Sequence, residues 1–139
     1  MPPAKTAQPS RDINKLCACV RAKWQRLVEI LEDDGLYLST ISVIRTKEEQ
    51  AQYVKGGTSK TMNSLHLPQP PYQLSLAIDV CPVPLLTTKN WTPTSPLWDR
   101  VGEVATEVGL RWGVWSKDKN GKLLNWDKAH LYLPKCQCV

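Results

Sequence analysis

The sequence predicts an α+β domain in which a small, mainly antiparallel sheet is packed with about three helices. Helix and strand patterns mix along the chain without the regular alternation that parallel sheets require. The dipeptide Asn120-Gly121, between two short apolar segments, favours an antiparallel hairpin. The 139 residues are enough for one hydrophobic core. We therefore expect a flexible arm at 1–12 and a single domain at 13–139.

The first helix is expected to begin after Asp12 and to end at Gly35, because apolar residues recur between them at spacings of three and four. Residues 36–44 are dominated by β-branched and aromatic side chains, which is typical of a strand. The segment 46–49 has the pattern of a capping box, with a hydroxyl followed three residues later by a carboxylate. It predicts a second helix that ends at 56–57.

The second half of the chain combines short strands with one more helix. Ser95 and Pro96 supply an N-cap followed by proline at the first helical position, and the apolar stripe after them ends at Gly109. The other segments are expected as a loop at 58–71, a buried strand at 74–80, an irregular stretch at 82–93, paired strands at 111–115 and 122–126, and a last strand at 129–133.

The charge and hydropathy of the chain limit its partners. The net charge is +5 and the pI about 9.0, which favours anionic partners such as an acidic wall polymer. The basic residues are scattered and form no nucleic-acid motif, so no nucleic-acid partner is expected. No apolar stretch approaches the ~20 residues of a membrane span. The first residues lack the apolar block of a secretory signal, so neither a cleaved signal nor a stable membrane anchor is expected.

The five cysteines are an odd number and include two Cys-x-Cys pairs, at 17–19 and 136–138. Without a secretory signal, reduced thiols are the expected state. A second, all-thiolate metal site is disfavoured, because structural zinc sites commonly separate their cysteines by two to four residues. On a helix, Cys17 and Cys19 would also point about 200° apart.

The chain has two histidines: His66, on a polar loop before the strand that carries Asp79, and His130, which follows Asp127. An isolated histidine is more often structural than a metal ligand. However, Asp79 interrupts an apolar run after His66, and Asp127 precedes His130 by three residues. Two imidazoles and one carboxylate form a known ligand set for catalytic zinc, with the fourth position open to water. The alternative is that both aspartates cap strands or lie on the surface.

Four short motifs follow one another along the chain: Ser64-Leu65-His66, Ala77-Ile78-Asp79, the Trp-Gly segment at 109–115, and Asp127-Lys128-Ala129-His130. Upstream of them lies Ile44-Arg45-Thr46, followed by Glu49-Gln50. In this order they resemble the zinc peptidases of bacterial cell-wall peptide stems. That family includes D-Ala-D-Ala carboxypeptidases and phage L-alanyl-D-glutamate endolysins, and the resemblance covers roughly residues 36–133.

The resemblance implies the fold that these DD-peptidases share with hedgehog-like domains, with a zinc site at the sheet. It implies that His66, Asp79 and His130 bind Zn²⁺ and that Asp127 is the catalytic acid and base. Arg45 matches an arginine that holds the substrate or the developing oxyanion in some members. The alternative for Arg45 is a charge that faces solvent at a strand end.

The implied function is hydrolysis of an amide bond in the peptide stem of peptidoglycan. The short endolysins favour a monomeric L-alanyl-D-glutamate endopeptidase of phage type, which stays in the host cytoplasm until lysis and then acts on the cell wall. Two alternatives remain open at this stage. One is a D-Ala-D-Ala carboxypeptidase, and the other is a binding module that keeps the zinc fold without turnover.

Three departures from the family pattern are expected to affect the site. Twelve residues separate His66 from Asp79, more than is usual, and the surplus at 68–73 resembles an inserted loop. Ser75 replaces a glycine before the Ala-x-Asp motif. Leu131 and Tyr132 follow His130 in place of an aromatic residue and a glutamate that can steady the site. Ser64 is expected to support its loop by hydrogen bonding and not to act as a nucleophile.

Overall fold

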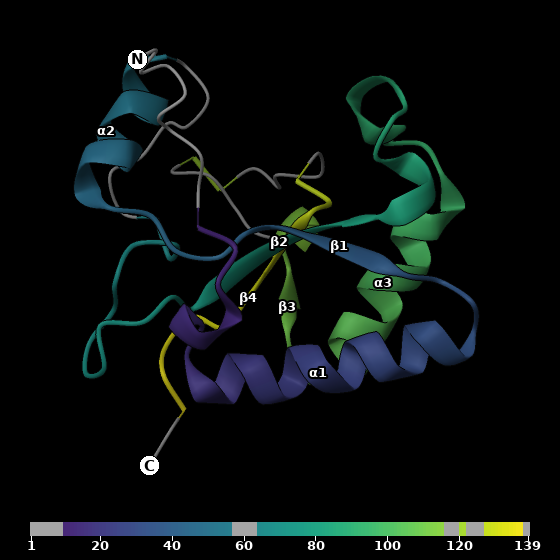
Figure 1. The fold of residues 1–139 in the computed structure, drawn as a ribbon, viewed down its shortest axis with the longest axis horizontal. Coiled ribbons are helices and arrows are strands. Elements are labelled where there is room, and N and C mark those ends of the chain that lie inside the picture. The colour runs from purple at the N-terminus through teal and green to yellow at the C-terminus, as the bar shows by residue number, and fades with distance from the viewer. Residues whose placement is uncertain (1–9, 57–63, 116–119, 122–126, 138–139) are drawn as a thin grey trace.

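The computed structural model describes residues 10–56, 64–115, 120–121 and 127–137, and these form the predicted α+β fold (Figure 1). Three α-helices and four strands make up its framework, joined by short 3-10 turns. Their bounds are α1 Ala18–Asp33, β1 Leu38–Ser42, α2 Lys47–Lys55, β2 Ala77–Pro82, α3 Pro96–Glu107, β3 Arg111–Trp112 and β4 His130–Tyr132, with 3-10 turns at Ile13–Lys15, Val83–Leu85, Lys89–Trp91 and Gly113–Trp115.

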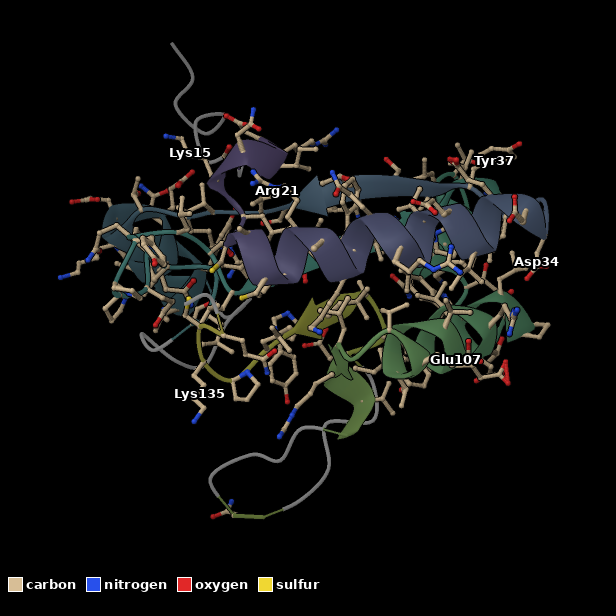
Figure 2. All side chains as sticks on the ribbon, turned by 90° about the horizontal axis from the view of Figure 1, so that it is seen from below. Lys15, Arg21, Asp34, Tyr37, Glu107 and Lys135 are labelled. Carbon is tan, nitrogen blue, oxygen red and sulfur yellow. The ribbon has the colours of Figure 1, made fainter. Side chains whose placement is uncertain are left out.

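The strands form one antiparallel sheet in the order β1-β2-β4-β3. Helices α1 and α3 contact each other, while α2 lies at the end of the molecule away from α3 (Figures 1 and 2). In β2, Ile78 and Val80 are fully buried and belong to the hydrophobic core. Side chains alternate between the two faces of a strand, so Asp79 points to the face opposite these two residues.

The first helix begins later than the sequence predicts. Asp12 caps only the 3-10 turn, its side chain accepting a hydrogen bond from the Asn14 amide. The chain then extends, because the Ser75 amide donates to the Lys15 carbonyl and the Cys17 amide donates to the Ser75 carbonyl. This pairing with a segment distant in the sequence takes the backbone out of the helix until Ala18.

The predicted divergence of Cys17 and Cys19 is therefore wrong. Cys17 is the N-cap of α1, with φ −54° and ψ 138°, and Cys19 lies in the first helical turn. Because Cys17 is extended and not helical, the angle of about 200° between helical side chains does not apply to this pair. The two Sγ atoms lie 3.5 Å apart.

The second correction concerns β2, which spans Ala77–Pro82 where the sequence predicts 74–80. Asp79 thus lies inside the strand and not at its end. The residues before it are held by other segments: the Leu76 amide donates to the Leu65 carbonyl, and the Ser75 Oγ donates to the Ala77 carbonyl at 2.7 Å. These hydrogen bonds satisfy the buried hydroxyl of Ser75.

The third correction concerns the segment 111–115, which is a strand only over its first two residues. It then turns into the 3-10 turn Gly113–Trp115. Strand β3 pairs with β4, and the expected partner strand at 122–126 lies outside the described residues.

The local helix signals are confirmed. Thr46 and Glu49 form both hydrogen bonds of a capping box at the start of α2, and Ser95 caps α3 with Pro96 at the first position. Residues 1–9 of the expected arm lie outside the described residues, whereas Ser10 accepts a hydrogen bond from the Val43 amide. Within the described ranges, no helix is long and apolar enough to cross a membrane.

Candidate metal centre and active site

The structure brings His66, Asp79 and His130 together at the sheet. Asp79 lies between the two rings: its Oδ2 is 3.2 Å from His66 Nε2, and its Oδ1 is 3.1 Å from His130 Nδ1. One ligand atom from each residue lies within 4.8 Å of the other two. The sheet register explains the contact between Asp79 and His130, because Asp79 on β2 is directly opposite His130 on β4.

His66 is held in one orientation by its loop. Its Nδ1 lies 2.8 Å from the Val43 carbonyl oxygen, and because a carbonyl can only accept, Nδ1 must donate. The His66 amide donates to the Ser64 hydroxyl, as expected, and the His66 carbonyl accepts from the Arg45 amide. The ring is 2% exposed.

In the neutral ring this orientation leaves a buried lone pair on Nε2 of His66, whereas in the protonated ring Nε2 would form an ion pair with Asp79. Among the described residues, this atom has no hydrogen-bond partner. In the neutral ring it faces the Asp79 carboxylate oxygen at 3.2 Å, and two lone pairs in that position repel each other unless a cation or a proton lies near both. The buried atom is the observation that most directly indicates a metal site.

The spacing of the three groups fits a metal ion of ordinary size. With metal–ligand distances of about 2.0–2.1 Å, the ligand atoms of a tetrahedral zinc site are about 3.3 Å apart. The 3.2 Å and 3.1 Å separations are close to that value and go to the two different oxygens of Asp79, so each imidazole lies within this distance of one carboxylate oxygen. The donor set of two imidazoles and one carboxylate is also the one that catalytic zinc uses.

The charges of this cluster favour an ionised Asp79. Burial alone would favour the neutral acid, but His66 and His130 hold the pKa of Asp79 well below its usual range. Burial would likewise lower the pKa of His130, but its hydrogen bond with Asp79 raises it above the usual value. Tyr132, two residues further along β4, stacks on the His130 ring with centroids 5.1 Å apart. Tyr132 thereby supports that ring.

Arg45 contacts the cluster and does not face solvent. Its Nη2 lies 3.6 Å from Asp79 Oδ2, and only 16% of its side chain is exposed. Two residues of α2 hold the guanidinium: Gln50 Oε1 accepts a hydrogen bond from Nη1 at 3.0 Å, and the Tyr53 ring lies 4.7 Å from Cζ. The cation is therefore fixed beside Asp79.

Asp127 lies at the start of the last described segment, three residues before His130. Burial raises the pKa of Asp127, and the electrostatic interaction with Asp79 also raises it, whereas those with His130, His66 and Arg45 lower it. It also lines a hollow of about 180 Å³, together with side chains from the 90–98 segment. Lys128, next in the chain, donates to the Pro93 carbonyl and fixes this segment.

The Trp-Gly motif positions the segment that carries Asp127 and His130. The Trp112 indole Nε1 donates to the Lys128 carbonyl at 2.8 Å. A Cβ at Gly113 would lie 2.6 Å from the Asp127 carbonyl oxygen and 2.9 Å from His130 Cβ. Glycine at 113 therefore permits the close approach that places both residues at the site.

Gly113→Ala is expected to displace the Asp127–His130 segment and to destabilise the fold by about 1–3 kcal/mol, the usual range for overpacking. Both the unfolding midpoint and the zinc affinity should fall. Thermal unfolding with and without added Zn²⁺ measures the two effects. Gly56→Ala is the matched control, since its nearest contact is a backbone oxygen at 3.3 Å, far from the cluster. An unchanged zinc affinity in Gly113→Ala would contradict the positioning role.

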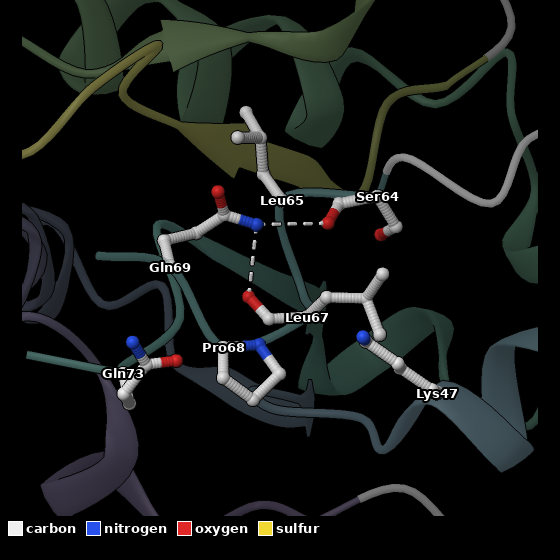
Figure 3. A pocket seen from close by; sticks show the side chains of 7 residues that line it. All are labelled: Lys47, Ser64, Leu65, Leu67, Pro68, Gln69 and Gln73. Atoms are coloured by element: carbon white, nitrogen blue, oxygen red, sulfur yellow. Dashed lines mark hydrogen bonds between the residues drawn. The ribbon is translucent and has the colours of Figure 1, made fainter. Parts of the chain in front are cut away.

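The inserted loop folds back on the residues beside His66. The Gln69 side-chain amide donates to the Ser64 and Leu67 carbonyls, which flank His66 in the chain (Figure 3). This loop forms one wall of a hollow of about 390 Å³ whose other side includes Lys47 at the start of α2. The insertion thus shapes the surface next to the cluster without displacing a member of it.

Sequence reasoning did not assign roles to several residues that support the cluster. The backbone carbonyl of Val43 fixes His66, Gln50 and Tyr53 hold Arg45, and Tyr132 stacks on His130. Strand alternation could have indicated Tyr132, because residues two apart on β4 share a face. The spacing of Gln50 and Tyr53 along one helix was also a usable signal.

The fold and the cluster together define the class of the protein: a small α+β domain that holds an aspartate and a histidine on neighbouring strands and a second histidine on the loop before them. No protein-family model matches the chain. The chain is 39% identical over 56 residues to the L-alanyl-D-glutamate peptidase of Listeria phage A118. That match takes in 40% of this chain and 20% of the relative, so the chain corresponds to a minor part of that protein's length.

Two solved structures share the fold over most of the chain. One is the L-Ala D-Glu endopeptidase ChiX of Serratia marcescens, with a TM-score of 0.59 and 20% identity over 92% of this chain and 87% of that one. The other is a mutant of the vancomycin-resistance D,D-pentapeptidase VanY in complex with Zn(II), with a TM-score of 0.58 and 19% identity over 88% and 74% of the two chains. The chain therefore has the fold of these L-Ala-D-Glu and D,D-peptidases, and the resemblance indicated by its motifs is confirmed.

Proposed function

We propose that the protein is a zinc peptidase that hydrolyses an amide bond in the peptide stem of bacterial peptidoglycan, with the L-alanyl–D-glutamate bond as its target. The buried, unpartnered Nε2 of His66 facing Asp79 is the observation that carries the metal site. The peptidase relatives in phage and bacteria support the substrate class. The phage relative also supports a role as an endolysin that acts on the wall at host lysis, and we propose that it does so as a monomer.

His66, Asp79 and His130 are the proposed ligands of Zn²⁺. When bound, zinc supplies Lewis acidity that activates a water for attack at neutral pH and polarises the scissile carbonyl. Three protein ligands would leave a fourth coordination position of the ion to water. Val43 and Tyr132 keep the two imidazole rings oriented, which is how supporting contacts maintain metal affinity.

Asp127 is the proposed general base and general acid. Its carboxylate accepts the proton of the attacking water and then donates it to the departing amine, so the group ends the cycle as it began. The guanidinium of Arg45, fixed by Gln50 and Tyr53, provides a positive charge beside the cluster. We propose that it stabilises the negative charge that develops on the carbonyl oxygen, because a cation that is already oriented needs no reorganisation during the reaction.

Digestion of purified peptidoglycan tests this function. We expect new amino termini on D-glutamate, detected by mass spectrometry of the released fragments, and no activity after the metal is removed with a chelator. Restoring Zn²⁺ should restore the activity. A digest that contains free D-alanine without a new D-glutamate amino terminus would contradict the endopeptidase and favour a D-Ala-D-Ala carboxypeptidase.

The carboxypeptidase is a specific second candidate, because VanY and ChiX match the chain with nearly equal TM-scores. A binding module without turnover is the third. It predicts bound zinc and binding to peptidoglycan with no new termini of either kind. The same digest therefore separates all three functions.

A further inference from the structure

A second cluster of metal-ligating side chains lies where the start of α1 meets the C-terminal tail. It consists of Cys17, Cys19 and Cys136, which we call the thiol cluster. The Cys17 Sγ lies 3.5 Å from the Cys19 Sγ and 3.4 Å from the Cys136 Sγ. All three sulfur atoms lie within 4.8 Å of one another. The cluster thus joins residues separated by more than one hundred positions in the chain.

The backbone places these thiols independently of the histidine cluster. The amide of Cys17 donates to the Ser75 carbonyl, so the N-cap of α1 is fixed to the segment before β2. The tail is fixed from the other side, because the Gln137 amide donates to the Cys19 Sγ at 3.3 Å. A backbone amide directed at a sulfur stabilises the thiolate form, which is the form that binds metals.

We propose that Cys17, Cys19 and Cys136 bind one thiophilic metal ion, Zn²⁺ in the simplest case, in a structural site that anchors the C-terminal tail to the start of α1. The sulfur atoms of a tetrahedral zinc site, at about 2.3 Å from the metal, are about 3.8 Å apart. The observed 3.4 Å and 3.5 Å approach that spacing and are well beyond the about 2.05 Å of a disulfide bond.

The charges around the thiol cluster favour bound thiolates. Cys17 and Cys19 lie at the N-terminal end of α1, the positive end of the helix dipole. Lys15 and Lys135, both exposed, lie at the same end of the molecule (Figure 2). Three thiolates around a divalent ion carry a net charge of about −1. The positive end of the helix dipole and the two lysines offset this charge. The side chain of Cys17 is buried and those of Cys19 and Cys136 are partly buried, as expected for a structural site.

Metal analysis of the full chain, loaded with Zn²⁺ under reducing conditions, tests the proposal. We expect two zinc ions per wild-type chain, and one in the Cys19→Ser/Cys136→Ser variant. Cys81→Ala is the matched control and should keep both, because Cys81 lies buried in β2 and burial raises the pKa of its thiol to about 11. Co²⁺ in place of Zn²⁺ should give a thiolate-to-metal charge-transfer band that only the cysteine variant loses.

The site should stabilise the fold by mass action. With free Zn²⁺ at 100 times the dissociation constant of the thiol cluster, that site should raise the unfolding midpoint by about 10 °C beyond the rise that the histidine cluster gives. Cys19→Ser/Cys136→Ser should lose this additional rise and keep the rest. Zinc content that is unchanged in that variant would overturn the proposal, as would a Cys17–Cys136 disulfide found by mass spectrometry in the reduced, zinc-loaded protein. His130→Ala separates this site from the proposed function, because it should lose peptidase activity while keeping the charge-transfer band.

Discussion

Asp127→Asn should lower the rate of amide hydrolysis by about 10²- to 10⁴-fold, the usual contribution of a general acid–base group, while the zinc content stays at the wild-type value. Asparagine has nearly the same size as aspartate but cannot accept the proton of the attacking water. The hydrogen bonds that fix this segment, from Trp112 to the Lys128 carbonyl and from Lys128 to Pro93, use no atom of the Asp127 side chain. The substitution therefore removes the chemistry and keeps the fold.

Turbidity loss of purified cell walls measures the rate for Asp127→Asn, and metal analysis measures the zinc. Asp33→Asn is the matched control, since Asp33 is exposed at the end of α1 and away from the cluster. It should retain the wild-type rate. An Asp127→Asn variant with full activity would show that another group transfers the proton, whereas one that lost zinc would show a role in holding the metal.

The parts of the fold that the sequence could predict are those specified by local chemistry. The capping box at Thr46 and Glu49 and the Ser95-Pro96 start of α3 depend on contacts within four residues, so their patterns are readable from the chain alone. His130 was a candidate for a similar reason, because it follows Asp127 by three residues. His66 was a candidate through the order of the motifs along the chain and their resemblance to a known family.

The parts that could not be predicted depend on segments distant in sequence. The start of α1 is set by Ser75, whose amide donates to the Lys15 carbonyl and whose carbonyl accepts from the Cys17 amide, so these two groups are not used for helical hydrogen bonds. The register that places Asp79 opposite His130 arises only when β2 and β4 pair. The thiol cluster was missed for the same reason: helix geometry was assumed for Cys17, and the third thiol comes from the far end of the chain. Patterns of neighbouring residues therefore do not predict these pairings.

Substitution of Asp79 is expected to remove both zinc binding at the histidine cluster and peptidase activity. Its two carboxylate oxygens face different histidines, and Arg45 lies 3.6 Å from one of them. Asp79→Asn removes the negative charge that these three groups share. We expect the variant to bind one zinc ion fewer per chain than wild type and to have no measurable peptidase activity. Without metal, it should also be less stable by about 3–5 kcal/mol, the usual cost of breaking a buried ion pair.

Asp79→Asn also decides whether the long spacing between His66 and Asp79 matters. Within the insertion at 68–73, the Gln69 side chain donates to the Ser64 and Leu67 carbonyls. Strand β2 still begins at Ala77 and contains Asp79, so the extra residues do not displace Asp79 from it. Shortening the loop should therefore leave zinc binding intact. Asp79→Asn should abolish zinc binding at the histidine cluster. Denaturant unfolding of the metal-free proteins, with Asp33→Asn as the reference, isolates the charge effect. An Asp79→Asn variant with wild-type zinc content would mean that a different carboxylate completes the site, and the insertion would then be the reason for the displaced ligand.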